Sequence, residues 1–504
     1  VLEPHLNSLG GECPILVRAP DGSVHAISGQ GCSPGAATPD RFPAAGVPGD
    51  GVSSAAVPAT VDAWLLLLKR HGRLPLSDVL RPAIELAADG FPVDAGLAAS
   101  IRANADVFAR WPSTRSVFGN AAPVLRQPDL ARTLETIAAE GRAGFHAGRI
   151  ARTLAEFFRE AHPDRGGAPV RGLISASDLE TFHGAWEPAV QAEGFGATVH
   201  KCGFWSQGPV FLQQLQILAG QDLGLLPESE RLHTEIEAAK LAFADREAWY
   251  GDPGFAAPPA SLLDPDYAAR RRTLIGPDAS LRLRPGLGAT ALPWTGGIVD
   301  RGFEPLAAHI GDTTHVDAAD RDGLMIAATP SGGWIQSNPL VPGLGFAPGT
   351  RLQMFNLLPS HPNRLEPRKR PRTTLSPSLA RLADGRWLAF GTPGGDGQDQ
   401  WTLQAFLGVA VHGRSLQEAV EAPLFLSTAF PSSFAPHGAD PGGVTLENRF
   451  DPGTVAALRD RGHAVSLAGP WDSGRVTMVS WDPATGILRG AASPRRGSAV
   501  ALAI

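Results

Sequence analysis

Gly311-Asp312-Thr313-Thr314-His315 opens the part of the sequence with the clearest local pattern. Two short runs with strand character follow it, at 314–319 and 324–329, and Asp320-Arg321-Asp322-Gly323 separates them. An Asp-Gly pair between two such runs is a strong β-hairpin signal, because glycine accepts the positive φ that a tight turn needs. We therefore predict two antiparallel strands here, with Thr313 just ahead of the first.

Two other segments combine hydroxyl residues or glycines with prolines. They are Arg370-Pro371-Arg372-Thr373-Thr374-Leu375-Ser376-Pro377 and Phe390-Gly391-Thr392-Pro393-Gly394-Gly395-Asp396-Gly397. Taken singly, each has an ordinary structural interpretation, since threonine is common on strands and Pro-Gly-Gly is typical of turns. Short motifs of this kind also recur by chance, so only their combination carries information about function.

The rest of the chain mixes strand and helix patterns. Turn residues and short apolar runs predict strands at 15–18, 23–27 and 387–390 and a second hairpin at 476–481 and 487–492. Apolar spacing predicts helices at 61–70, 78–89, 129–139, 148–159, 232–249, 400–411, 416–422 and 455–461, with another beginning near Ser177. Residues 50–250 are therefore expected to be mostly helical, and the Pro-, Gly- and Arg-rich residues 251–311 to form a long surface segment. This mixture predicts a layered α/β architecture.

Composition excludes several classes of protein. The 504 residues are 43% hydrophobic and 19% charged, with a net charge of −6, which fits a globular protein and argues against a basic nucleic-acid footprint. The longest aliphatic run is Trp64-Leu65-Leu66-Leu67-Leu68, far short of the ~20 apolar residues that span a bilayer. We expect neither nucleic acid nor a membrane as a partner.

The familiar metal and cofactor motifs are also missing. Cys13, Cys32 and Cys202 form no CxxC pair, and no two histidines have the spacing of a helical metal site. The glycine-rich run at 343–349 lacks the strand and helix that flank a dinucleotide site. We therefore expect no cofactor. The chain begins with Val1, so we interpret it as a fragment or a processed product of a soluble protein, cytoplasmic, periplasmic or secreted.

In their order and spacing, the three segments around Thr313, Thr373 and Gly394 resemble the γ-glutamyltranspeptidase family of N-terminal-nucleophile hydrolases. The resemblance extends over nearly the whole chain. It includes Asn7-Ser8-Leu9-Gly10-Gly11, residues 76–92, Ala239-Lys240-Leu241-Ala242-Phe243-Ala244-Asp245-Arg246 followed by Gly251-Asp252-Pro253, and residues 415–423. Such a set is much more specific than any one of its members.

The resemblance implies a fold, a maturation step and a set of partners. Family members fold as a single αββα sandwich of two stacked, mainly antiparallel sheets flanked by helices. They cut their own chain before a threonine, which here matches the bond between Asp312 and Thr313. The products would be a large subunit, 1–312, and a small subunit, 313–504. The expected substrate is a small amide, with water or an amine as acceptor, and the processed heterodimer could pair into a homodimer.

The resemblance also assigns catalytic roles. Thr313 would be the nucleophile, supported by Ser331 from the next strand, while Gly394 and Gly395 would supply the backbone N–H groups of the oxyanion hole. The physical logic is sound, because a threonine hydroxyl needs a nearby base. A freed α-amino group, with a pKa near ~8, can accept that proton, whereas the amide of an internal threonine cannot.

The substrate-binding positions of the family are only partly retained. Thr373 and Thr374 match hydroxyl residues that hold the α-carboxylate of the substrate, and Gln353 is kept. The family's carboxylate-binding arginine, however, matches Gln30. Its pocket asparagine matches Gly333, and its amine-binding aspartate matches Asn356. Losing these partners removes charge-assisted contacts, so the amide-cleaving machinery looks intact while the γ-glutamyl pocket is altered.

Several alternatives remain open at this point. The substrate could be a γ-glutamyl amide or a non-γ-glutamyl amide of the glutaryl-cephalosporin or oxamate type. Arg372 or Arg351 could supply a substitute cation for an anionic acyl group, or either could be a solvated surface charge. His315 and Cys32 are expected to be structural. A different class of function is an unprocessed, non-catalytic relative that only binds small amides.

Overall fold

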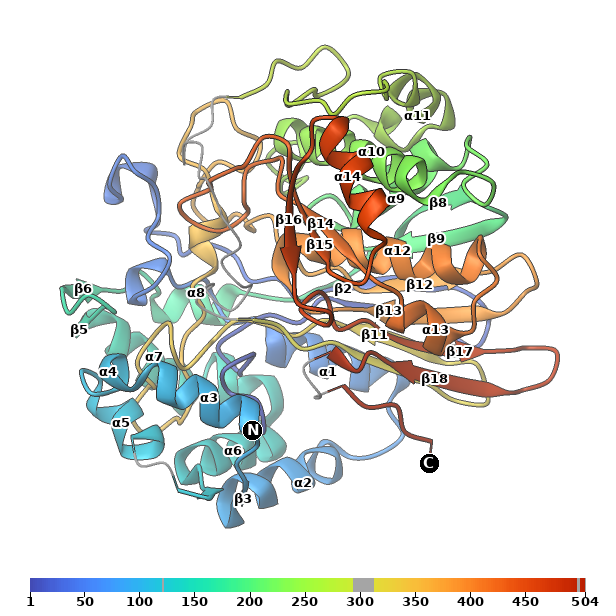
Figure 1. The fold of residues 1–504 in the computed structure, drawn as a ribbon. Helices are drawn as coiled ribbons and strands as arrows, with labels where there is room; N and C mark the ends of the chain where they lie inside the picture. Colours follow the sequence, from blue (N-terminus) through green and yellow to red (C-terminus); the bar gives the residue numbers. More distant parts are fainter. Residues whose placement is uncertain (120–121, 293–311, 496–498, 504) are drawn as a thin grey trace.

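The centre of the molecule is a pair of stacked antiparallel sheets, whose strands run across the middle of Figure 1. The computed structural model describes residues 1–119, 122–292, 312–495 and 499–503. In spatial order, the first sheet contains β10 (Val316–Ala319), β11 (Met325–Ala328), β1 (Ile15–Arg18), β2 (Val24–Ser28) and β7 (Ala185–Pro188). The second contains β18 (Leu488–Ala492), β17 (Thr477–Trp481), β13 (Trp387–Gly391), β12 (Ser378–Arg381), β9 (Ala197–Lys201) and β8 (Val190–Gly194).

The two sheets bury a shared apolar layer. Leu16 and Ala327 from the first sheet pack with Leu379 and Ala389 from the second, and all four are inaccessible to solvent. Every ladder in the two sheets is antiparallel, so one face of each strand can point into this layer while the other meets the flanking helices. Both parts of the chain, before and after Thr313, contribute strands to both sheets.

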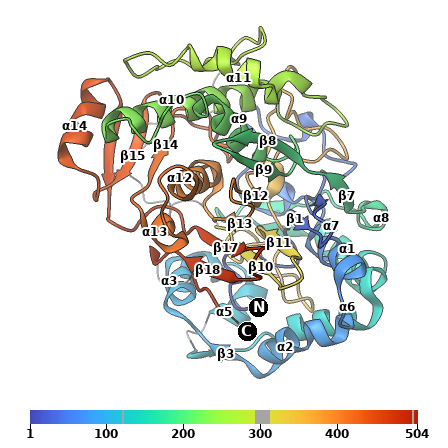
Figure 2. The same cartoon turned by 90° about the vertical axis from the view of Figure 1, so that its right-hand side faces the viewer.

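Helices cover the outer faces of the sandwich, as Figure 2 shows, with α9, α10 and α12 on one side and α1 and α6 on the other. Ala63 of α1 (Thr60–His71) packs on Ile15 and Val17 of the first sheet. Phe211 of α9 (Gly208–Leu218) and Phe406 of α12 (Gln398–Ala410) pack on the second. The αββα fold class predicted from the sequence is therefore confirmed.

The remaining elements surround this sandwich. The other helices are α2 (Leu76–Asp89), α3 (Ala95–Ala103), α4 (Ala105–Phe108), α5 (Pro112–Phe118), α6 (Pro128–His146), α7 (Arg149–Arg159), α8 (Ala176–Thr181), α10 (Glu228–Trp249), α11 (Pro265–Arg272), α13 (Leu416–Glu421) and α14 (Pro452–Asp460). The small sheets comprise β3 (Phe91–Pro92) with β4 (Val124–Leu125), β5 (Ala161–Pro163) with β6 (Pro169–Arg171), and β14 (Phe425–Ser427), β15 (Gly443–Glu447) and β16 (Ala464–Ala468). Within the described ranges, no helix is both long and apolar enough to cross a membrane.

Sequence patterns located the hairpins and most helices within a few residues, and residues 50–250 are mostly helical as expected. The strands β7, β8 and β9 within this range, which belong to both sheets, were not predicted. The turn between β8 and β9 uses Phe195 and Gly196, both at positive φ, so the usual Asn-Gly or Asp-Gly signal is missing. Residues 251–311 include α11 rather than only irregular structure, while 293–311 lie outside the described residues.

A buried ion pair joins the second sheet to α12. Lys201 Nζ lies 2.8 Å from Asp399 Oδ1, and neither side chain is exposed. The ammonium also donates to Ser376 Oγ and Ser378 Oγ, both at 2.8 Å, and Ser376 Oγ donates to Asp399 Oδ1 at 2.6 Å. Burial lowers the pKa of Lys201 and raises that of Asp399, so each charge depends on the other.

This network predicts a large effect of removing one partner. Lys201→Met should lower the free energy of unfolding by about 3–5 kcal/mol, because it leaves the Asp399 charge buried and uncompensated. The double variant Lys201→Met/Asp399→Leu should recover most of the loss. Urea unfolding of wild type, single and double variants measures this, and a double variant no more stable than the single one would contradict it.

Candidate active site

Thr313 stands at the start of the first sheet, immediately before β10. It forms an isolated bridge with Ser331, which follows β11, and the hydroxyls of the two residues lie 3.1 Å apart. Its backbone N–H donates to Asp312 Oδ1 at 2.9 Å. Thr313 and Ser331 are both buried. The hairpin predicted from the sequence thus places these two hydroxyls side by side.

A buried arginine fixes the Ser331 hydroxyl from the other side. Arg351 Nη2 donates to Ser331 Oγ at 2.5 Å, while its Nε donates to a carboxylate oxygen of Glu12. The guanidinium lies over the Trp334 ring, 5.0 Å from its centroid, and 5.9 Å from that of Phe434. Arg351 is 1% exposed and Glu12 is 3% exposed, so the pair is shielded from water.

Glu12 was not found by sequence reasoning, although a carboxylate between Gly10-Gly11 and the buried strand β1 was a usable signal. Burial raises the pKa of Glu12 to about 7, because desolvation outweighs the opposing attraction of Arg351. Its second carboxylate oxygen, Oε2, has no hydrogen-bond partner in the part of the chain that the structure describes. The carboxyl group is therefore poised to titrate near neutral pH.

The predicted oxyanion loop follows β13. Gly394 has φ 114° and Gly395 has φ 53°, a backbone conformation that side-chain-bearing residues rarely adopt. A Cβ atom on Gly394 would lie 2.3 Å from the Trp401 ring, and one on Gly395 would lie 3.0 Å from the Phe434 ring. Both positions therefore require glycine.

Asp396 anchors this loop to its surroundings. Its carboxylate accepts hydrogen bonds from Arg246 Nη1 at 2.5 Å and from the Ser433 hydroxyl and backbone N–H at 2.6 and 2.9 Å. Burial raises the pKa of Asp396, but the Arg246 charge and the Ser433 hydrogen bonds outweigh it and hold the pKa below its usual value. The loop is thereby tied to α10 and to the segment that carries Phe434.

Shared neighbours place the loop beside Thr313. The Trp401 ring packs against both Gly394 and Gly474, and the next residue, Arg475, forms an ion pair with Asp312 at 2.5 Å. On the other side, the His315 ring packs on Gly391 at the end of β13. The residues predicted to be catalytic, Thr313, Ser331, Gly394 and Gly395, therefore gather at one end of the sandwich.

His315 has the structural position that the sequence suggested. Its two ring nitrogens lie 2.9 Å from Thr329 Oγ1 and 2.8 Å from Asp317 Oδ1. Cys32 is partly buried beside an apolar cluster, and burial raises the pKa of its thiol to about 12. Neither side chain is presented as a base or a nucleophile.

The positions predicted to hold a substrate carboxylate lie on neighbouring segments. The loop after β2, which carries Gln30, lies beside the segment leading to Thr373 and Thr374, since Ser33 N–H donates to Lys369 O at 2.8 Å. Thr373 Oγ1 accepts from Leu375 N–H at 3.3 Å. Gln30 Oε1 and Thr374 Oγ1 are buried and have no partner among the described residues. These two atoms could meet a polar group of a ligand.

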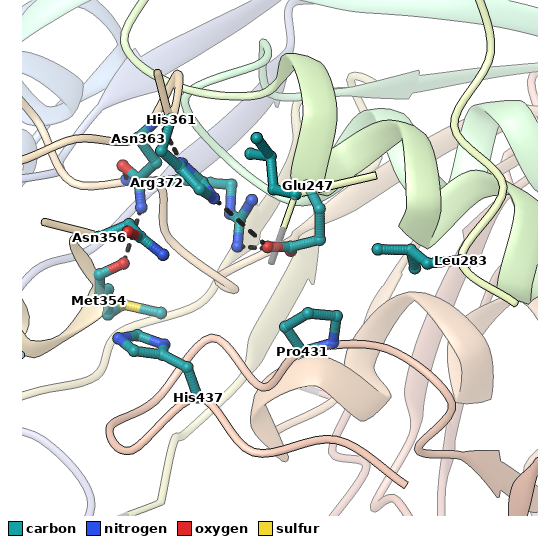
Figure 3. A pocket seen from close by; sticks show the side chains of 10 residues that line it. Glu247, Leu283, Met354, Asn356, His361, Asn363, Arg372, Pro431 and His437 are labelled. Atoms are coloured by element: carbon teal, nitrogen blue, oxygen red, sulfur yellow. Dashed lines mark hydrogen bonds and ion pairs between the residues drawn. The ribbon is translucent and has the colours of Figure 1, made fainter. Parts of the chain in front are cut away.

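Asn356 and Arg372 line a small pocket, shown in Figure 3. The other lining residues are Glu247, Leu283, Leu292, Met354, His361, Asn363, Pro431 and His437. Met354 connects the pocket to the centre described above, because its Sδ lies 3.8 Å from Arg351 Nη1. Burial lowers the pKa of both His361 and His437, which favours neutral imidazoles in this pocket.

Neither arginine considered as a substrate-binding cation is a solvated charge, and neither is unpaired. Arg372 is 4% exposed and donates to Glu247 Oε1 at 2.8 Å, as Figure 3 shows, while Arg351 pairs with Glu12. Burial raises the pKa of Glu247, but Arg372 and Arg246 outweigh it and hold the pKa far below its usual value. Each candidate cation is thus already in contact with a carboxyl group of the protein.

The remaining predicted substrate residues are also engaged by the protein. Gln353 Nε2 donates to Gly49 O at 3.0 Å and to Thr350 Oγ1 at 3.1 Å. Asn356 Oδ1 accepts from Leu358 N–H at 2.8 Å. Gly333 has φ 67°, and a Cβ there would lie 2.1 Å from Ser8 Oγ, so a larger side chain does not fit. The asparagine expected from the family is therefore excluded sterically.

Comparison with known proteins agrees with this geometry. A family model described as Gamma-glutamyltranspeptidase matches residues 1–503. The chain is 30% identical over 517 residues to the glutathione hydrolase-like YwrD proenzyme of Bacillus subtilis, covering 100% of this chain and 91% of that protein. It is 30% identical over 519 residues to the oxamate amidohydrolase proenzyme of Klebsiella pneumoniae, covering 99% and 91%. The solved structure of LmbA2991HD matches with a TM-score of 0.92 and 42% identity, covering 100% of this chain and 92% of that one.

The chain belongs to the gamma-glutamyltranspeptidase family. It is accordingly an enzyme of the N-terminal-nucleophile class that cleaves amide bonds. The described residues include no group of three or more His, Cys, Asp or Glu side chains that could hold a metal ion.

The raised pKa of Glu12 predicts a pH-dependent stability. Between pH 4.5 and about 7 the folded protein keeps this proton while the unfolded chain releases it, so stability falls as pH rises. At 1.36 kcal/mol per pKa unit, wild type should lose about 3 kcal/mol relative to Glu12→Gln across this window. Chemical denaturation of both proteins at the two pH values measures the difference, and a constant difference would show that Glu12 stays ionised throughout.

Proposed function

We propose that the chain cuts itself between Asp312 and Thr313 and then hydrolyses or transfers a small acyl group through an ester on Thr313. The observation that carries this proposal is the buried contact of 3.1 Å between the Thr313 and Ser331 hydroxyls at the start of β10. The relatives named as proenzymes support a two-subunit product, 1–312 and 313–504, made from one precursor. Because both parts contribute strands to both sheets, the two subunits would stay interlocked after cleavage.

In the proposed turnover, the freed α-amino group of Thr313 accepts the hydroxyl proton as the oxygen attacks the amide carbonyl. The backbone N–H groups of Gly394 and Gly395 bind the oxygen that becomes negative, and such a donor is typically worth ~3 kcal/mol. The leaving amine takes the proton, which leaves an acyl ester on Thr313. Water or an amine then attacks the ester and restores the hydroxyl.

The acyl group that this site fits best lacks the zwitterionic head of a γ-glutamyl group. Arg372 and Arg351 are each paired with a carboxylate, and Gln30 and Asn356 are neutral where the family has charged residues. The pocket in Figure 3 is lined by the paired charges of Arg372 and Glu247 together with amides, imidazoles and apolar groups. We therefore place the substrate among the non-γ-glutamyl amides.

Replacement of the proposed nucleophile tests the mechanism. Thr313→Ala should remain full length and lose amide turnover, since it lacks both the attacking oxygen and the new amino terminus. Thr313→Ser keeps a hydroxyl and is the matched control, so it should still be cut and remain active. Intact mass and amide hydrolysis are measured on both. Turnover by Thr313→Ala at the parent rate would rule out an ester on this residue, and a wild-type chain that stays whole and inert would identify a non-catalytic binder.

Three anilides that differ only in the acyl head test the substrate class. The γ-glutamyl, glutaryl and butyryl p-nitroanilides carry a zwitterionic, an anionic and a neutral group, and all three have the same three carbons beyond the amide carbonyl. We expect kcat/KM for the γ-glutamyl compound to be no more than tenfold above that for the butyryl compound. The reason is that the described residues of the site offer no charge-assisted hydrogen bond that would stabilise the zwitterionic head group. A preference of more than a hundredfold for the γ-glutamyl compound would contradict the assignment.

A further inference from the structure

The carbonyl oxygen of Asp312 accepts two hydrogen bonds from buried side chains. Trp334 Nε1 donates to it at 2.7 Å, and Ser331 Oγ donates to it at 3.1 Å. This oxygen belongs to the peptide bond that joins Asp312 to Thr313. Trp334 is 3% exposed and Ser331 is inaccessible, so water does not compete for these donors.

The neighbours of Ser331 fix where its single proton points. Arg351 can only donate to Ser331 Oγ, and the Asp312 carbonyl can only accept from it. The Ser331 proton must therefore face Asp312 O, and the Thr313 hydroxyl must donate its own proton to Ser331 Oγ. Ser331 therefore donates no hydrogen bond to Thr313 Oγ1, and the lone pairs of that oxygen are not engaged by Ser331.

We propose that Trp334 and Ser331 form the oxyanion hole of the self-cleavage step, separate from the Gly394–Gly395 pair that serves substrate turnover. This inference rests on the proposed function, since it concerns the reaction that creates the amino terminus of Thr313. It assigns a catalytic role to Trp334, a residue that no sequence pattern singled out. One chain thus carries two oxyanion holes, one for its own peptide bond and one for its substrate.

The step balances as an intramolecular acyl shift followed by hydrolysis. Thr313 Oγ1 bonds to the carbonyl carbon of Asp312, and the carbonyl oxygen becomes an oxyanion held by Trp334 and Ser331. The carbon–nitrogen bond then breaks, and the proton lost from the hydroxyl ends on the nitrogen, which becomes the free amine. Water cleaves the resulting ester, leaving a carboxylate on Asp312 and restoring the Thr313 hydroxyl.

Two features of Trp334 suit it to this task. Its indole N–H also donates to Leu6 O, which lies 2.8 Å from Nε1. In the neutral precursor the one N–H therefore has two carbonyl acceptors, Leu6 O and Asp312 O. Negative charge developing on Asp312 O would draw the proton to that oxygen, so the interaction strengthens in the transition state. The indole is also held in place by the Arg351 guanidinium, 5.0 Å from its ring centroid.

The experiment follows the self-cleavage of freshly made full-length chain by intact mass for wild type, Trp334→Phe and Trp111→Phe. Trp111 is the matched control, because it is fully buried and its Nε1 donates to Pro163 O at 2.7 Å rather than to Asp312. Removing one oxyanion donor typically slows a reaction by 10²–10³-fold, so Trp334→Phe should slow cleavage by about a hundredfold. Trp111→Phe should change the rate by less than threefold.

Each result decides a distinct claim. If wild type is cut before Thr313 and a folded Trp334→Phe is cut at the same rate, the second oxyanion hole is wrong while the proposed function stands. If wild type is never cut there, the proposed function itself fails. Should Trp334→Phe show no cooperative thermal transition, Ser331→Ala and Ser331→Thr replace it. The alanine variant must then be cut at least tenfold more slowly and the threonine variant must restore cleavage, and equal rates for all three overturn the inference.

Discussion

The buried guanidinium of Arg351, held between Glu12 and Ser331, is the constraint on which the proposed chemistry depends. A charge at 1% exposure is stable only with a partner, and Glu12 supplies one while Ser331 completes the hydrogen bonding. Because the arginine can only donate and the Asp312 carbonyl can only accept, the two together set the direction of the Ser331 and Thr313 hydroxyl protons. The same pairing removes a cation that could otherwise have bound an anionic substrate, so one interaction shapes both the proposed catalysis and the proposed selectivity.

Ion pairs attach the loops around this centre to the rest of the sandwich and so fix their positions. Asp396 anchors the predicted oxyanion loop to Arg246 of α10, and Asp399 anchors the next turn to Lys201 of β9. Both ties cross from one part of the chain to the other, on either side of Asp312. A cut before Thr313 would therefore free an amino terminus without releasing the segments that surround it, which is what an enzyme made by self-cleavage requires.

Local periodicity and turn chemistry predicted both hairpins and the approximate helices, while the family resemblance predicted the αββα fold class. The local patterns missed β8 and β9, whose turn at Phe195-Gly196 lacks the usual residues. The resemblance located Thr313, Ser331, Gly394 and Gly395, which the structure gathers at one end of the sandwich. The partners of Arg351 and Arg372 could not be predicted, since pairing depends on long-range packing. Trp334 has no local signal, because its role arises only where its N–H meets the Asp312 carbonyl.

The most direct test of the central claim is amino-terminal sequencing of an active preparation of the protein. The account predicts that the small chain begins Thr-Thr-His-Val and that its abundance rises in step with amide turnover. A fully active preparation in which that terminus never appears would contradict the account, because the proposed base and nucleophile would then not exist together.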